Sequence, residues 1–187
     1  IRAAAESGWD FSSRWFKDGK EMASIQTTDL IPVDLNCLLL YLEETLQKIY
    51  QQQNDAENVK QFQIKIYNRK AAIQQYCWNE EQGCYFDFNC VEHQQVQHFN
   101  LATVFPLFFK IATQEQAEKV ATLVKEKFVF PGGVVTTLYR TGQQWDAPNG
   151  RAPLQWITIK GLKNYNHIDL AKDIAAKWIQ LNKDVSQ

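Results

Sequence analysis

Residues 2–15, RAAAESGWDFSSRW, are the stretch from which the interpretation of this 187-residue sequence starts. They gather glycine, tryptophan and a carboxylate within a few positions, and their aromatic side chains need a core, so we expect an ordered loop that extends to Met22. Glycine lets the backbone approach a ligand closely, and a neighbouring tryptophan excludes water and raises a carboxyl pKa towards that of a general acid. The alternative is that Asp10 caps a helix beside a tryptophan of the core.

Helical periodicity dominates the sequence that follows this loop. A helix is predicted to open at Pro32, which suits a first helical turn. An apolar stripe of helical period runs through Leu35, Leu38, Leu39, Leu42, Leu46 and Ile49. Further helices are expected over residues 56–76, 101–111, 114–127, 153–165 and 168–182. Extended segments are expected at residues 85–88 and 134–139, the latter after the chain break at Pro-Gly-Gly.

The helices are separated by loops that alternate between short and long. The long loops carry the clusters of Gly, Trp and Asp. Rigid helices with a functional site built from loops at one end are what an α/α toroid requires. The sequence therefore predicts an all-α fold with about six helices, half of those in a twelve-helix barrel.

A second loop, residues 141–151, contains the run Gln144-Trp-Asp-Ala-Pro-Asn-Gly150. Amide, aromatic and carboxylate groups alternate here within one turn. Sugar hydroxyls need paired donors and acceptors, and the apolar face of a sugar stacks on tryptophan, so this loop is a candidate carbohydrate-binding wall. A Pro-Asn-Gly turn with a capping aspartate explains the same residues equally well. Asp34 and Asn36, near a helix start, are interpreted as caps and not as ligands.

The composition is that of a globular protein, with 45% hydrophobic residues and a net charge of −1. No basic stripe is present, which argues against a nucleic-acid partner, and no apolar run of about 18 residues predicts a membrane span. Neither zinc-ligand spacing nor a phosphate-binding glycine loop occurs, so no metal and no cofactor are expected. The cysteines are expected to be free thiols, which favours a reducing compartment such as the cytoplasm over a periplasmic or secreted location; a Cys84–Cys90 disulfide is the alternative.

Three segments carry a resemblance to a known family. Residues 2–15 resemble the segment that holds the catalytic acid in trehalases of glycoside hydrolase family 37. Thr28-Asp-Leu-Ile-Pro-Val-Asp-Leu-Asn36 is similar to the helix-entry segment that follows it, and Pro131-Gly-Gly133 together with residues 144–150 resembles a second family signature. The likeness runs over essentially all 187 residues, in the same order and with the same spacing.

This resemblance implies an (α/α)6 toroid of the six-hairpin glycosidase type and an inverting hydrolysis of α,α-trehalose, a small disaccharide, to two glucoses. Asp10 matches the family's general acid, and Gly8 matches a glycine whose backbone contacts the sugar. The wall around the glycone site is matched by Gln144, Trp145, Asp146 and Asn149.

Two departures from the family bear on activity. The family's general base is a glutamate in a segment after the last helix seen here, and its upstream arginines have no match, so we expect residues 1–187 to form a single partial domain, the middle portion of the catalytic domain, inactive by itself. Arg151 stands where trehalases usually have tryptophan. Two alternatives therefore stay open: a degenerate trehalase-like protein that binds sugar or serves as a scaffold, and a toroid glucosidase for another α-glucoside.

Overall fold

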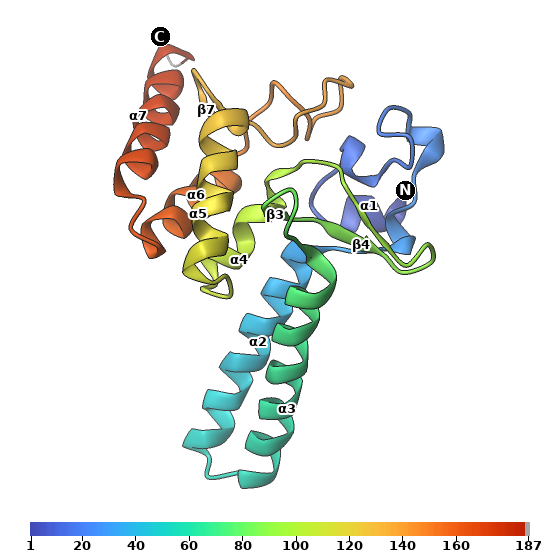
Figure 1. The fold of residues 1–187 in the computed structure, drawn as a ribbon, viewed down its shortest axis with the longest axis vertical. Coiled ribbons are helices and arrows are strands. Elements are labelled where there is room, and N and C mark those ends of the chain that lie inside the picture. Colours follow the sequence, from blue (N-terminus) through green and yellow to red (C-terminus); the bar gives the residue numbers. More distant parts are fainter. Residues whose placement is uncertain (186–187) are drawn as a thin grey trace.

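Helices account for most of residues 1–185, the part of the chain that the computed structural model describes (Figure 1). The α-helices are α1 (Arg2–Glu6), α2 (Val33–Gln52), α3 (Ala56–Ala72), α4 (Phe105–Phe108), α5 (Gln114–Leu123), α6 (Ala152–Asn164) and α7 (Ile168–Val185). Helices α3 and α5 each continue into one π-helical turn, Ile73–Cys77 and Val124–Phe128. The predicted all-α class is confirmed.

Short antiparallel strands connect the helices. One sheet has β4 (Asp87–Asn89) at its centre, between β1 (Leu30–Ile31) and β5 (Gln94–Val96). Two further pairs join β2 (Trp78–Asn79) to β3 (Cys84–Tyr85) and β6 (Val129–Phe130) to β7 (Gly133–Val134). Because Leu30 lies opposite Asn89, the sheet ties the segment before α2 to the segment after α3.

Two segments differ from their predicted structure. The loop expected over residues 2–22 begins with α1, because the run of alanines in this stretch favours a helical turn. The helix expected over residues 101–111 is a 3₁₀ turn, Leu101–Val104, followed by α4, which ends at Phe108. Lys110 lies just beyond with a φ of +57°, a left-handed conformation that cannot continue a helix.

Helices α2 and α3 form an antiparallel hairpin that projects from the rest of the chain (Figure 1). Asp55 caps the start of α3 with its side chain. Arg69 of α3 donates to both carboxylate oxygens of Glu43 on α2, at 2.8 and 2.7 Å. The rings of Tyr50 and Phe62 stack with centroids 5.5 Å apart, so polar and aromatic contacts both hold the two helices together.

Most of the predicted apolar stripe of α2 lies on the surface. Leu35, Leu38, Leu42 and Ile49 are 49, 47, 51 and 41% exposed, whereas its other two members, Leu39 and Leu46, are half-buried. The residues that α2 buries, Cys37 among them, come from a different face of the same helix. Helix α2 is therefore apolar on two faces, and the described part of the chain covers only one of them. We refer to the four exposed residues as the α2 stripe.

Helices α4 to α7 pack around the main core. Helix α5 starts with a capping box, in which the Thr113 side chain and the Gln116 side chain each bind the other's backbone N–H. Helix α6 comes close to α4 at Gly161, where a Cβ would lie 3.1 Å from Phe108 N and 3.2 Å from Leu107 Cβ. The absence of a side chain at this glycine sets the distance between the two helices.

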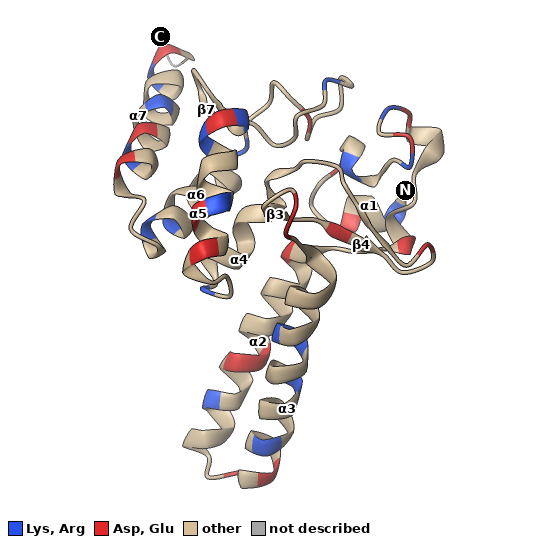
Figure 2. Cartoon of the chain, viewed as in Figure 1, with Lys and Arg blue, Asp and Glu red and all other residues tan. Residues whose placement is uncertain are grey.

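Acidic and basic residues are interspersed along the helices and are not separated onto opposite faces (Figure 2). All four cysteines are free thiols, and burial raises the pKa of Cys77 and of Cys84 to about 12. None of the helices within residues 1–185 combines the length and the apolar character needed to cross a bilayer.

The contact at Gly161 gives a stability prediction. Alanine normally stabilises a helix by about 1 kcal/mol relative to glycine, whereas forcing a methyl group into a packed contact costs about 1–3 kcal/mol. We expect Gly161→Ala to lower the free energy of unfolding by up to about 2 kcal/mol in urea denaturation, because the backbone of α4 cannot move aside cheaply. An increase in stability, the ordinary result for this substitution in a helix, would contradict the packing argument.

Candidate active site

Asp10 lies in an exposed position on the loop that follows α1. Gly8, two residues earlier, has a φ of +78° and no heavy atom within 4 Å of the place where a Cβ would lie. Glycine adopts this conformation readily, and the space beside it is open to a ligand. The loop leaves α1 through Ser7, whose Oγ donates to Ala4 O at 2.6 Å and accepts from Trp9 N at 3.1 Å.

The backbone is held on both sides of Asp10. On one side Trp15 Nε1 donates to Trp9 O at 3.0 Å. On the other side Trp145 N donates to Phe11 O at 2.9 Å. The peptide bond between Asp10 and Phe11 is cis. Because Trp145 belongs to the second loop, the structure brings together the two loops that the sequence singled out.

Asp146 joins the same two loops from a fully buried position. Its carboxylate accepts hydrogen bonds from the hydroxyls of Ser12, Ser13 and Thr137 at 2.9, 2.9 and 3.0 Å, and from Ser13 N at 3.0 Å. The Thr141 hydroxyl also donates to it. A carboxylate offers about four lone-pair sites, so these five donors leave none for a sugar hydroxyl. The sugar contact expected of Asp146 does not agree with this geometry. The hydrogen bonds of Asp146 join the two loops instead.

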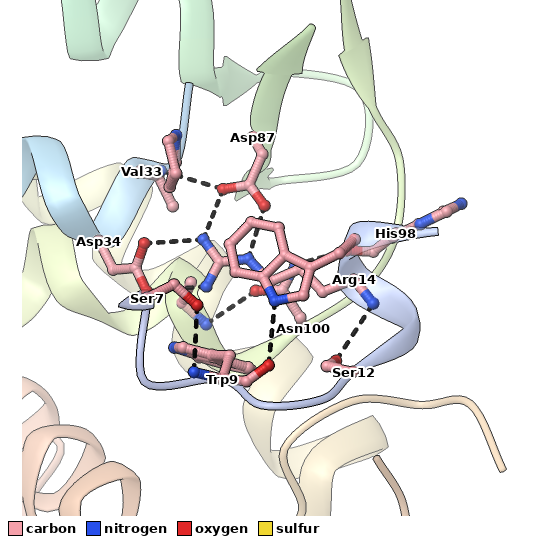
Figure 3. A network of polar contacts seen from close by, with 12 residues as sticks. Ser7, Trp9, Ser12, Arg14, Val33, Asp34, Asp87, His98 and Asn100 are labelled. Carbon is pink, nitrogen blue, oxygen red and sulfur yellow. Dashed lines mark hydrogen bonds and ion pairs between the residues drawn. The ribbon is translucent and has the colours of Figure 1, made fainter. Parts of the chain in front are cut away.

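Arg14 is the buried centre of the polar network behind this loop (Figure 3). Its guanidinium donates to both oxygens of Asp34, at 2.7 and 2.8 Å, and to both oxygens of Asp87, at 2.8 and 2.7 Å. Asp87 also accepts from Val33 N at 3.0 Å. Since Asp34 and Val33 begin α2 and Asp87 begins β4, one guanidinium connects the loop of Asp10 to two other elements.

The charges of this network stabilise one another against burial. Burial disfavours the charged guanidinium, but the two carboxylates and their hydrogen bonds outweigh it and raise the pKa of Arg14 above its ordinary value. Burial also opposes the ionisation of Asp34, and Arg14 overcomes it, so that the pKa of this carboxyl is lowered. Asp34 was expected to cap a helix, but it is an ion-pair partner of Arg14. Asn36 was expected to be a cap as well, and its side-chain oxygen accepts a hydrogen bond from Arg69 at 2.8 Å.

Guanidinium groups and indole rings continue from this network to the surface as a stack of five side chains. The Arg14 Cζ atom lies 4.5 Å from the ring centroid of Trp15 and 4.6 Å from that of Trp9. The rings of Trp9 and Trp145 lie 5.1 Å apart, and Arg151 Cζ lies 5.1 Å from Trp145. Guanidinium–indole contacts at such distances are attractive. Trp145 is thus packed between Trp9 and Arg151, which reduces the ring surface that a sugar could meet.

Gln144 and Asn149 are exposed at the surface of the second loop. Their backbone is fixed, because Arg151 Nη2 donates to Gln144 O at 2.6 Å and Thr136 N donates to Asn149 O at 3.1 Å. The side-chain amide of Gln144 makes no hydrogen bond with any residue of 1–185, and that of Asn149 reaches Gln143 O at 3.4 Å, at the edge of hydrogen-bond distance. Both amides are therefore available to a ligand.

A cavity of about 490 Å³ lies between α1 and the start of α2, away from Asp10. Its lining includes Ser7, Trp15 and Asp34, together with Leu35 and Leu38 of the α2 stripe. None of the residues predicted for the site lines it. Of the predicted residues, Asp10, Gly8, Gln144 and Asn149 are exposed, whereas Trp145 is half-buried and Asp146 is buried.

Sequence reasoning missed the residues that hold this site. Arg14 and Asp87 were given no role, and neither were Thr137 and Thr141. The available signal was an arginine inside an aromatic run that must be buried, since a buried guanidinium requires acidic partners. Nothing in the sequence says which of the 21 acidic residues those partners are.

Comparisons with known proteins bear on the family and the fold of the chain. The sequence profile of the family described as Trehalase matches residues 1–187. Neutral trehalase Nth1 from Saccharomyces cerevisiae is 26% identical, with a TM-score of 0.80 over 94% of this chain and 34% of that chain. The GH63 mannosylglycerate hydrolase from Thermus thermophilus, solved with Tris, is 18% identical, with a TM-score of 0.70 over 83% of this chain and 38% of that one. The expected fold, part of an (α/α)6 toroid, is confirmed, and the chain spans about a third of the length of the first of these proteins.

The ion pairs of Arg14 give a second stability prediction. Arg14→Met keeps much of the length of the side chain but leaves two buried carboxylates without a partner, which costs about 3–5 kcal/mol in comparable cases. We expect a loss of this size in urea denaturation. Arg2→Met is the matched control, because Arg2 pairs with Glu6 on the surface, with 91% of its side chain exposed. Equal losses in the two variants would contradict the assignment of Arg14 as the organising cation.

Proposed function

This chain belongs to the trehalase family, and on that premise we propose that it carries the general acid of an inverting glycoside hydrolase that splits α,α-trehalose into two glucoses. The observation that carries the proposal is the placement of Asp10. It is exposed, while the backbone on either side of it is bound by Trp15 and Trp145. A proton donor that acts on a bound substrate needs this combination of access and fixed position.

In this mechanism Asp10 protonates the oxygen that bridges the two sugars, and a second carboxylate takes a proton from the attacking water. The two carboxyl groups of inverting enzymes lie about 6.5–9.5 Å apart, which leaves room for that water. The buried carboxylates behind the loop are unsuited to the second role, because Asp34 and Asp87 bind Arg14 and Asp146 accepts five hydrogen bonds. In the family that the sequence resembles the base is a glutamate, and on that resemblance we propose that it lies outside these 187 residues.

The other residues divide into those that touch the sugar and those that hold the site. Gly8, with open space beside its backbone, and the free amides of Gln144 and Asn149 are placed in the first group. Asp146 is placed in the second group, because its hydrogen bonds all go to the protein. Trp145 belongs to both, since it is half-buried under Arg151 and binds the backbone beside Asp10.

We further propose that residues 1–187 are one part of a larger catalytic domain and do not hydrolyse trehalose by themselves. The chain spans 34% of the length of the yeast enzyme that it resembles. The α2 stripe is a second support, because a row of large apolar side chains at helical spacing is typical of a face that packs against another helix.

A degenerate, non-catalytic protein is the second candidate, and the observation that favours it is Arg151 in place of the usual tryptophan. The position of Arg151 in the stack weakens this alternative, because the arginine keeps Trp145 packed. An enzyme for another α-glucoside is separated from a trehalase by a panel of substrates. Turnover of trehalose decides between an enzyme and a scaffold.

Replacement of Asp10 tests its role in the complete protein. Asp10→Asn keeps the shape of the side chain and removes the acidic proton, so kcat on trehalose should fall by about 10²–10⁴-fold. An activated substrate such as glucosyl fluoride needs less protonation of its leaving group and should lose less. Asp173→Asn, an exposed carboxylate of α7 paired with Lys177, is the control and should keep full activity. Equal losses on both substrates would argue against the acid role of Asp10.

The stereochemistry of the products tests the inverting mechanism. Inversion occurs only at the attacked carbon, so each trehalose should first release one β-glucose and one α-glucose. Proton NMR spectra recorded in the first minutes, before mutarotation, should show the two anomers in equal amounts. A signal from α-glucose alone at early times is the result that excludes inversion.

A further inference from the structure

Gln155 is a buried amide whose two polar atoms bind the backbone of a single residue. It lies near the start of α6 and is 1% exposed. Its Oε1 accepts from Val134 N at 2.9 Å, and its Nε2 donates to Val134 O at 2.7 Å. The amide therefore acts like the backbone of a neighbouring strand alongside β7, and both backbone groups of Val134 are satisfied by one side chain.

Two glycines from different loops make room for this side chain. A Cβ at Gly133 would lie 2.5 Å from Gln155 Oε1, and a Cβ at Gly150 would lie 2.9 Å from Gln155 Nε2. Real side chains do not tolerate the shorter of these distances, and Gly133 also has a φ of +105°. Gly133 of the Pro-Gly-Gly run and Gly150 of the Asn-Gly run therefore both lie against the side-chain amide of Gln155.

From Val134 the chain leads to the candidate wall within three residues. Thr136 donates to Asn149 O from its backbone N, at 3.1 Å, and from its Oγ1, at 3.2 Å. Thr137 Oγ1 donates to Asp146 at 3.0 Å. These hydrogen bonds couple the position of Val134, which Gln155 holds, to the position of the loop that presents Gln144 and Asn149.

We propose that Gln155 is a positioning residue for sugar binding. It acts through Val134 and Thr136 to hold the backbone of Asn149, so that the free amides of Gln144 and Asn149 face the glycone. The proposal rests on the proposed function of this loop and extends it to a residue that touches no substrate. Its loss should weaken binding more than it lowers kcat, because Trp15 of its own loop still holds the backbone beside Asp10 when the hold from Trp145 of the second loop is loosened.

Two variants and one control isolate this role in the complete protein. Gln155→Leu removes both hydrogen bonds to Val134. Gln155→Glu keeps the size of the side chain and the acceptor for Val134 N, but it replaces the donor to Val134 O by a carboxylate oxygen, whose buried charge adds its own cost. Thr158→Val is the control, because Thr158 is equally buried in the same helix and its Oγ1 binds only Leu154 O, one turn earlier, at 2.7 Å.

Steady-state kinetics on trehalose give the first measurement. A buried group left without its partner costs enough to weaken binding about tenfold, so KM should rise by about that factor or more in both Gln155 variants, while kcat falls by a smaller factor. A smaller folded fraction would lower the apparent kcat and leave KM unchanged, which separates positioning from simple loss of structure. An unchanged KM in Gln155→Glu, or an equal rise of KM in Thr158→Val, would overturn the proposal.

Hydrogen exchange gives a second measurement that needs no turnover. The backbone amides of Thr136 and Asn149 should exchange faster in both Gln155 variants than in the wild-type protein, and Thr158→Val should leave them protected. Equal exchange in all four proteins would overturn the coupling between Gln155 and the loop. If the wild-type protein neither binds nor hydrolyses trehalose, the proposed function fails, and this measurement still decides whether Gln155 positions the loop.

Discussion

The structure depends on the burial of one guanidinium group. Arg14 has no exposed side-chain surface, and a charge in that position is tolerated only with partners of opposite charge and a full set of hydrogen bonds. Asp34 and Asp87 supply both, from positions 20 and 73 residues away in the sequence. The three segments must therefore come together before any of these charges can leave water, and the loop that carries Asp10 is ordered as a consequence.

A second constraint follows from the different exposure of the carboxylates. Asp34, Asp87 and Asp146 are buried and bound to protein groups, whereas Asp10 is exposed on a backbone that these residues help to fix. A polar atom that is already hydrogen-bonded within the protein cannot also act on a substrate. The group that acts on the substrate must therefore be held through its backbone while its own polar atoms stay unbound. Gln155 extends the same division to the second loop, where a buried amide fixes the backbone and leaves the exposed amides free.

The sequence predicted what depends on local pattern and missed what depends on distant contacts. Helices α2, α3, α5, α6 and α7 follow from apolar periodicity and caps, and their predicted bounds differ by a few residues. The helix expected over residues 101–111 was wrong beyond Phe108, because a segment that is apolar on every side carries no period from which its end can be located. The two loops of the candidate site were singled out because glycine, tryptophan and aspartate cluster in them, but the direction of the Asp146 side chain depended on contacts with Ser12 and Thr137, which lie 134 and 9 residues away in the sequence.

Arg151 illustrates how a substitution at a family position can be absorbed by the packing around it. An indole in this place would cover Trp145 with a flat apolar surface. A guanidinium group is also flat, stacks on aromatic rings and carries donors in its plane, and here one of these binds Gln144 O while the group covers the ring. A lysine, whose ammonium is a point charge on a flexible stem, would offer neither the plane nor the fixed donor. Arginine therefore covers Trp145 and holds the backbone of Gln144, and it places a positive charge on the same loop as the exposed amides of Gln144 and Asn149.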